Sequence, residues 1–410
     1  MAAEFTKEMK KTHTILLPMM LPYHNRLLQA AFSACGYRLE IMPEAERLSE
    51  RALPYISGDY CLPALLILGQ MLSVVEDGKY DCSKIALMEP QTGGACRAGN
   101  YYNLMIESLK KAGFLQVPVI SLNAFGEEKQ AGFRITPKLV KGAVAAVCYG
   151  DLLMSLYQQL RSYEKEAGSA DRKLQQWTKL LAEEIENGKY ISRKFRKERY
   201  RKIINDFNLI ERNDISCRRI GIAGEIYMKF SPVGNDNLEE FLQKLGCEYR
   251  MGGFVNYAIY LVDTERDKQR LLGAGSAVLA AIDEVKKYLL KIQMEINEAF
   301  KETSELVPDS DFEHLKELAQ GIIDSQCNIG DGWLIAGEAA DLIEKGFTNI
   351  LILHPFGCLV SHVCGRGILK NLHEKYPNVN IQTIEYDYDS SKTLRESRIM
   401  LGISNVLRVK

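Results

Sequence analysis

The sequence has almost no net charge, and this excludes partners that only a strong electrostatic field would attract. Its 52 lysines and arginines are balanced by 53 aspartates and glutamates, which leaves a formal charge of -1. A protein that binds nucleic acid or a membrane surface through a global field needs a marked excess of basic residues. We therefore expect neither nucleic acid nor a membrane as a partner.

Targeting segments and repeats are also missing. Residues 1–13 are polar and lack the apolar core of a signal peptide, and no later segment approaches the roughly 20 uninterrupted apolar residues of a membrane span. No short-period repeat or low-complexity tract is present. The sequence thus predicts a cytoplasmic protein. Because that compartment keeps thiols reduced, the ten cysteines are expected to be packing residues, reactive thiols or metal ligands and not a disulfide framework.

What is present is apolar residues in regular patterns. The chain has 410 residues and is 46% hydrophobic, which is enough to bury a large core in two or three domains. Runs rich in β-branched residues alternate with amphipathic stretches. The expected strands are residues 14–17, 38–41, 84–87, 117–120, 219–224, 349–353 and 378–382. The expected helical stretches are residues 24–35, 62–76, 99–112, 137–210, 268–302 and 394–403.

This alternation predicts the fold class. Strands separated by helices of this length form parallel βαβ units. We therefore expect an α/β protein with two Rossmann- or flavodoxin-like parallel-sheet domains and an intervening helical segment. The expected boundaries are 1–130 for the first α/β domain, 131–215 for the helical segment and 216–410 for the second α/β domain.

Both α/β halves place a cysteine in the same local plan of strand, glycine-containing loop, cysteine and helix. The strand KIALM leads into EPQTGGACRAGN, and NILIL leads into HPFGCLVSHV. Ligands collect at the carboxyl ends of strands in open parallel sheets, so Cys96 and Cys358 lie where a site is expected. Cys61 precedes Pro63, a residue favoured in the first turn of a helix. All three sulfurs are therefore expected at helix N-termini, where backbone N–H groups stabilise the thiolate that binds metal.

The other cysteines carry weaker signals. Packing or simple exposure explains most of them better than ligation does, because free cysteine is among the most buried residue types. These are Cys35, Cys82, Cys217, Cys247 and, on a helix, Cys148. Cys327 and Cys364 stay undecided, and whether any of Cys148, Cys327 and Cys364 adds a ligand stays open.

Dispersed single cysteines favour an iron-sulfur cluster over a zinc ion. Structural zinc sites show close C-x-x-C or Cys/His pairs, and this sequence has no C-x-x-C. Three cysteine ligands on a four-iron cluster would leave one iron open to substrate or solvent.

Four stretches that include these cysteines resemble a known family. YCLPALLILGQ, MEPQTGGACRAGNYYNL, GEIYMKFSPVGNDNLEEFL and HPFGCLVSHVCGRGI look like the 2-hydroxyacyl-CoA dehydratase superfamily, especially the dehydratase-like part of large activase-related proteins. The resemblance runs in order along nearly the whole chain. It implies two α/β domains that hold a [4Fe-4S] cluster between them on Cys61, Cys96 and Cys358.

The resemblance also implies a partner and a reaction. In such proteins a separate homodimeric ATPase, the activator, delivers a low-potential electron that the dehydratase uses for radical removal of water from a 2-hydroxyacyl-CoA. A related branch, the double-cubane cluster proteins, joins two cubanes through a sulfide into an [8Fe-9S] cluster and reduces small molecules. The absence of a G-x-x-x-x-G-K-S/T loop agrees with an external ATPase.

These observations lead to one main hypothesis and two alternatives. The main hypothesis is an iron-sulfur lyase of the dehydratase type or an ATP-dependent reductase, acting on an acyl-CoA or a small molecule as a homo- or heterodimer. The alternatives are a non-catalytic electron relay or scaffold in an activase system, and a cysteine hydrolase that uses Cys358 and a histidine. The chain is either a stand-alone version or a piece of a fused activase.

Several polar residues near the cysteines have two interpretations each. His354 and His362 flank Cys358; we expect one of them to orient the loop and the other to lie on the following helix. Glu225 either reaches the site or caps the next element. Arg97 pairs either with a CoA phosphate or with a surface carboxylate. The segment NIGDGW is a candidate cradle for a phosphate or a thioester.

Overall fold

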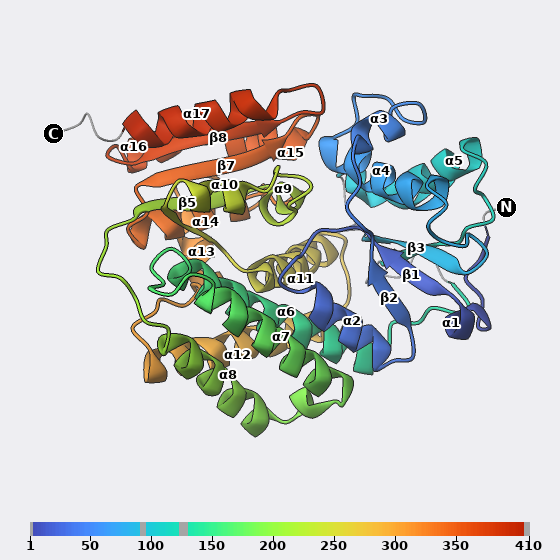
Figure 1. Cartoon of the computed structure of the whole chain (residues 1–410), viewed down its shortest axis with the longest axis horizontal. Helices are drawn as coiled ribbons and strands as arrows, with labels where there is room; N and C mark the ends of the chain where they lie inside the picture. The colour runs from blue at the N-terminus through green and yellow to red at the C-terminus, as the bar shows by residue number, and fades with distance from the viewer. Residues whose placement is uncertain (1–2, 91–95, 123–129, 406–410) are drawn as a thin grey trace.

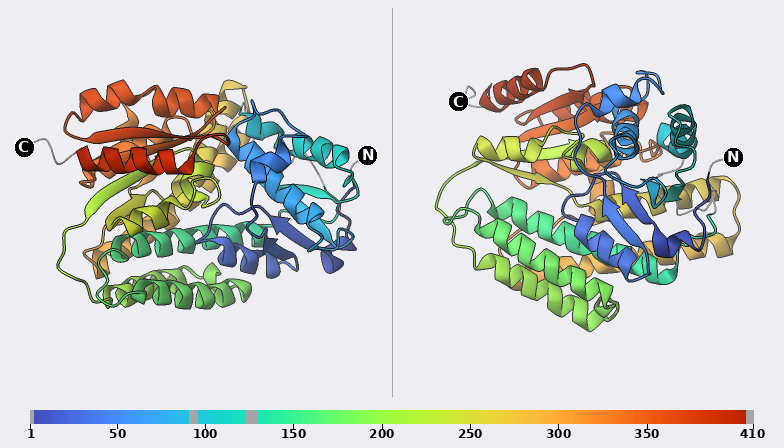
Figure 2. Two further views of the ribbon diagram at one scale, coloured as in Figure 1. Left: turned by 45° about the horizontal axis from the view of Figure 1, so that its top comes forward. Right: turned by 45° about the vertical axis from the view of Figure 1, so that its right-hand side comes forward.

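The computed structural model describes residues 3–90, 96–122 and 130–405. Within them the chain forms two four-stranded sheets in which every strand pair is parallel, and helices flank each sheet. Figure 1 shows the two sheets side by side, with a layer of helices below both, and the views in Figure 2 agree. The expected α/β class, with two parallel-sheet domains and an intervening helical segment, is confirmed.

The first sheet has the strand order β2-β1-β3-β4. Its strands are β1 (Thr14–Leu17), β2 (Arg38–Ile41), β3 (Ile85–Pro90) and β4 (Val119–Leu122). The helices of this half are α1 (Met9–Thr12), α2 (Asn25–Ser33), α3 (Leu48–Ala52), α4 (Leu62–Glu76), the 3₁₀ turn η1 (Arg97–Asn100) and α5 (Tyr101–Lys111).

Helices cover both faces of this sheet because its strands are apolar on both faces. Ile15 packs with Phe32 of α2, whereas the next residue, Leu16, packs in the cluster that contains α4. Successive strand residues point to opposite faces, so a strand buried on both sides is a continuous apolar run and not an alternating one.

The second sheet repeats this topology in the order β6-β5-β7-β8. Its strands are β5 (Arg218–Gly224), β6 (Cys247–Met251), β7 (Asn349–Pro355) and β8 (Asn380–Tyr386). Its shorter helices are α9 (Ile226–Phe230), α10 (Leu238–Lys244), α13 (Phe312–Ala319), α15 (Leu359–Ser361), the π-helical turn η3 (His362–Arg366) and α16 (Leu369–Lys375). Its longer helices are α11 (Phe254–Leu271), α12 (Ser276–Thr303), α14 (Leu334–Glu344) and α17 (Lys392–Asn405). In each sheet the chain first adds a strand on one side of β1 or β5 and then crosses to the other side. Strands β3 and β7 therefore occupy equivalent positions, next to β1 and β5 at this switch in direction.

The helical segment joins the two halves. It consists of α6 (Pro137–Leu160), α7 (Ser169–Glu186), the 3₁₀ turn η2 (Lys189–Ile191) and α8 (Arg193–Asn208). One hydrophobic cluster combines these helices with α2 of the first half and with Phe300 of α12 in the second. Among the described residues, α6 is long and apolar enough to cross a membrane by length and composition, and 72% of its most apolar window is buried inside the structure.

Strand boundaries differ from the prediction mainly at the ends. Strands β1 and β2 have the expected residues, whereas β4 and β8 begin two residues later than expected. Strand β6 was not predicted, because its sequence CEYRM has charged side chains at alternate positions. Both are buried and paired in the structure, with Arg219 contacting Glu248 and Asp309 contacting Arg250.

Candidate functional site

A largely apolar cavity of about 570 Å³ lies where the two halves meet. Its lining includes five cysteines: Cys61, Cys96, Cys327, Cys358 and Cys364. The structure therefore brings all three of the predicted ligands to one cavity, together with the two cysteines that the sequence left undecided. Cys148 is buried within α6 and Cys247 within β6, and neither belongs to this lining.

Each of the three predicted ligands occupies the N-cap position of a helix. Cys61 caps α4, Cys96 caps η1 and Cys358 caps α15. The expected setting of loop, cysteine and helix is thus present at all three. The glycines that precede Cys96 in the sequence, at 93 and 94, lie outside the described residues.

Two neighbours contact the sulfurs directly. The Tyr101 hydroxyl lies 2.8 Å from Cys61 Sγ, and the backbone N–H of Ser361 donates to Cys358 Sγ at 3.4 Å. The Ser361 hydroxyl lies 3.1 Å from the same sulfur. Sequence reasoning missed Tyr101, although its place in the first turn of the helix after Cys96 is a signal that could have identified it.

Backbone contacts fix the loop of Cys358 against the loop of Cys61. The N–H of Leu62 donates to the carbonyl of Phe356 at 3.2 Å. Gly357 has a φ of +75°, and a Cβ on it would lie 3.0 Å from the carbonyl oxygen of Tyr60. Glycine is therefore required here both by its backbone conformation and by the close approach of the two halves.

We predict that Gly357→Ala weakens this junction. A side chain at positive φ costs about 1–2 kcal/mol, and overpacking at a tight contact costs about 1–3 kcal/mol more. Gly113→Ala is the matched control, because Gly113 has a φ of +86° and a Cβ on it would meet no atom within 4 Å. Urea unfolding of both variants should show the larger loss for Gly357→Ala; equal losses would mean that the contact with Tyr60 contributes nothing.

The surroundings favour the neutral thiol over the thiolate at all three cysteines. Burial raises the pKa of Cys61 and Cys96 and raises the pKa of Cys358 to about 12, and the nearby Glu225 carboxylate adds to each increase. The backbone N–H groups act in the opposite direction and are outweighed. The helix N-termini therefore act on the three pKa values in the expected direction, and desolvation is the larger effect here. A cationic centre in the cavity would supply the missing stabilisation.

Two buried carboxyl groups act on the cavity. The Glu225 carboxylate follows β5 and accepts from the N–H of Met228 at 2.9 Å, so it caps α9 as one of the two interpretations expected. Burial raises its pKa to about 7. Asp331 accepts from the N–H of Ile226 at 3.1 Å, and burial and the Glu225 charge raise its pKa well above the usual range. A carboxyl group that holds a proton near neutral pH can act as a proton donor. Asp331 was not predicted, because the glycines beside it suggested a backbone cradle and not a side-chain role.

The remaining predicted residues have other contacts. Arg97 donates to the carbonyl of Asp59 and lies over the ring of Tyr60, 5.2 Å from its centroid, so among the described residues it pairs with no surface carboxylate. The NIGDGW segment is closed by a hydrogen bond of 2.8 Å from the N–H of Trp333 to the carbonyl of Cys327.

The two histidines both lie beside the Cys358 loop. His354 belongs to β7, and His362 begins η3 with its Nδ1 2.7 Å from the carbonyl oxygen of Cys358. His362 therefore orients the loop and does not face the sulfur. This geometry gives no support to a hydrolase in which a histidine activates the Cys358 thiol.

Comparison of the sequence with protein-family models and with the curated proteins found no match. The assignment to a family therefore stays a prediction that rests on the four motifs quoted above.

Proposed function

We propose that this chain is an iron-sulfur enzyme of the 2-hydroxyacyl-CoA dehydratase type. It would receive a low-potential electron from an ATP-hydrolysing activator and use it for dehydration or for reduction of a small molecule. The observation that carries the proposal is the convergence of Cys61, Cys96 and Cys358, each at a helix N-cap, on one cavity between two parallel-sheet halves.

The donor set and its surroundings fit a [4Fe-4S] cluster. Three single cysteines from separate loops supply thiolate ligands, and together they leave one iron open. The cavity wall is apolar at Ile329 and Val360, and an apolar surrounding influences the potential of a cluster. Such a cluster supplies one-electron chemistry when bound. Tyr101 would position the Cys61 sulfur, and Glu225, whose pKa burial raises to about 7, is the candidate proton donor.

The surface at the mouth of the cavity suits a protein partner. Leu359 and Val363 line the cavity and are 78% and 55% exposed. Neighbouring exposed apolar side chains mark interaction sites on many soluble proteins. An activator that docks here would bring its electron close to the cysteines.

A reductase with a double-cubane [8Fe-9S] cluster is the second candidate. It is favoured by Cys327 and Cys364, which line the same cavity as the other three cysteines and supply additional thiolates. Cys148 is not in this set. If the chain is instead an electron relay or scaffold, it would hold the same cluster but would not turn over a substrate.

Anaerobic purification with counts of iron and sulfide tests the proposal. We expect about four irons per chain for a single cubane and about eight for a double one. Addition of activator, ATP and an acyl-CoA or small-molecule substrate should then give turnover. Iron without turnover would favour the relay or scaffold, and a colourless, air-stable protein would contradict the proposal.

A further inference from the structure

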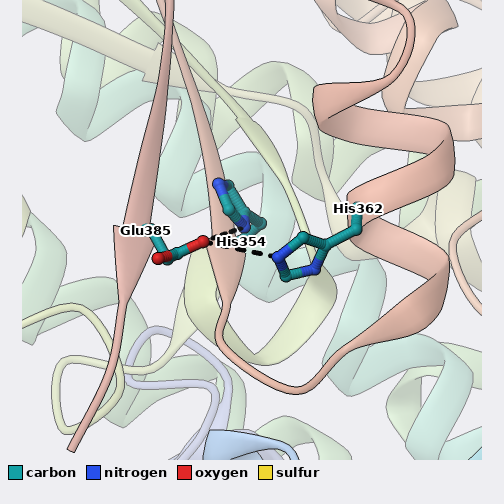
Figure 3. Close-up of side chains that lie close together, drawn as sticks. All are labelled: His354, His362 and Glu385. Atoms are coloured by element: carbon teal, nitrogen blue, oxygen red, sulfur yellow. Dashed lines mark ion pairs between the residues drawn. The ribbon is translucent and has the colours of Figure 1, made fainter.

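Two histidines and a glutamate converge beside the cysteine cavity (Figure 3). Their strands and turn explain the convergence: His354 on β7 pairs in register with Glu385 on the adjacent strand β8, and His362 begins η3 directly after the loop. Glu385 Oε2 lies 3.4 Å from His362 Nε2 and 3.8 Å from His354 Nδ1. The three ligand atoms all lie within 4.8 Å of one another, and no other group of this kind occurs among the described residues.

The hydrogen bond of His362 determines which of its two ring nitrogens carries the hydrogen and which carries the lone pair. Its Nδ1 lies 2.7 Å from the carbonyl oxygen of Cys358, and a carbonyl can only accept, so Nδ1 carries the hydrogen. In the neutral ring Nε2 is then bare and points at a carboxylate oxygen. Two acceptors that face one another need a cation or a proton between them. A backbone carbonyl that fixes a histidine tautomer is also the usual arrangement behind a metal ligand.

In the described part of the chain, His354 also directs a ring nitrogen without a hydrogen-bond partner at Glu385. It is 1% exposed, and its Nδ1 has no hydrogen-bond partner among the described residues while facing Glu385. A buried nitrogen without a partner costs free energy that a ligand would recover. Burial lowers the pKa of this ring to about 4, so at neutral pH the ring is uncharged and one of its two nitrogens carries a lone pair.

We propose that His354, His362 and Glu385 form a binding site for a divalent first-row transition ion, with Zn²⁺ as the reference ion. Two imidazoles and one carboxylate are a donor set that zinc uses when a fourth position stays open. In a tetrahedral site with bonds of about 2.0–2.1 Å, neighbouring ligand atoms lie roughly 3.4 Å apart, close to the two measured separations. The site is distinct from the thiolates, because it takes the opposite side of the His362 ring from Cys358.

Arg366 is the competing cation at this site. Its Nη1 lies 3.7 Å from Glu385 Oε2, and its side chain is 60% exposed. An exposed ion pair of this kind contributes little to stability. A metal ion can therefore displace the guanidinium into solvent at little cost.

Zinc binding by the anaerobically purified protein tests the site. After equilibration with Zn²⁺ and removal of unbound metal, we expect about one zinc per chain in addition to the iron. X-ray absorption at the zinc edge should give first-shell distances of about 2.0–2.1 Å from N and O atoms, and not the roughly 2.3 Å of Zn–S bonds. The distance therefore separates this site from zinc that replaces iron on the cysteines.

Glu385→Gln supplies the decisive variant, since it is isosteric and Glu385 is partly exposed. We expect its zinc affinity to fall by at least about tenfold with its iron count unchanged, because it removes an anionic ligand from this site only. His314→Ala is the control, because His314 also faces two glutamates, Glu317 and Glu344, on the surface. Sulfur in the zinc shell, no zinc uptake, or equal affinity in the two variants would overturn the proposal. The iron count taken before zinc is added tests the proposed function separately from all three outcomes.

Discussion

Replacing Cys96 by alanine is expected to remove most of the iron from the anaerobically purified protein. If three thiolates hold one cluster, the loss of one leaves two cysteines from different helix N-caps, Cys61 and Cys358, which cannot retain it. The iron count should fall from about four per chain to below about one. Turnover with activator and ATP should fall with it. The measurements are iron and sulfide per chain and the visible absorbance of the same sample.

Cys247→Ala is the matched control for this experiment. Cys247 is also a buried thiol, but it lies in β6 and outside the cavity lining. Cys247→Ala should lower the free energy of unfolding, as the creation of a small core cavity does, without loss of iron. Equal iron in the Cys96 and Cys247 variants would show that Cys96 is not a ligand. If the count in the unmodified protein is near eight, Cys364→Ala and Cys327→Ala should each lower it as well.

The fold could be predicted where apolar patterning alone determines the element. Strand β1 is a short apolar run, and in β2 the buried Leu39 lies between the exposed charged residues Arg38 and Glu40; both strands match the prediction residue for residue. Strand β6 could not be predicted in this way. Its charged residues are buried because partners from distant segments neutralise them, as Asp309 does for Arg250 across 59 positions of sequence. No local pattern contains that information.

The site shows the same division between local and distant information. The N-cap positions of Cys61, Cys96 and Cys358 follow from loop and helix signals within a few residues of each. The direction of their pKa shifts does not, because it depends on burial and on carboxylates that approach from the other half. Glu225 lies 129 positions further along the chain than Cys96, and its charge raises the pKa of the Cys96 thiol. The local pattern contains the stabilising N–H groups and not the larger desolvation.

A buried ion pair holds the segment that carries Glu225. The ammonium of Lys229 on α9 lies 2.7 Å and 2.8 Å from the two carboxylate oxygens of Glu338 on α14. The side chains are only 1% and 3% exposed. In this geometry one ammonium satisfies both oxygens, so each partner depends on the other for compensation of its desolvation.

Lys229→Met is therefore expected to lower the free energy of unfolding by about 3–5 kcal/mol, since it leaves a buried carboxylate without its counter-charge. Urea unfolding measures the loss. The double variant Lys229→Met/Glu338→Leu should recover most of it, because a buried pair replaced by apolar side chains of similar size is often close to neutral. A double variant as unstable as the single one would show that packing around Lys229, and not its charge, sets the cost.

The loss in Lys229→Met should also depend on pH, with a sign that identifies the unpaired carboxyl. Burial raises the pKa of Glu338 in the folded protein, and the Lys229 charge opposes that increase. Without Lys229 the folded-state pKa moves further above the unfolded value of about 4.3, so the folded state binds the proton more tightly than the unfolded state. The destabilisation should be small below that pH, grow as pH rises towards the folded-state pKa and level off above it. Destabilisation that is the same at pH 5 and pH 8 would mean that another cation pairs with Glu338 in the variant. Destabilisation that grows with pH would show that Lys229 alone compensates the Glu338 carboxylate.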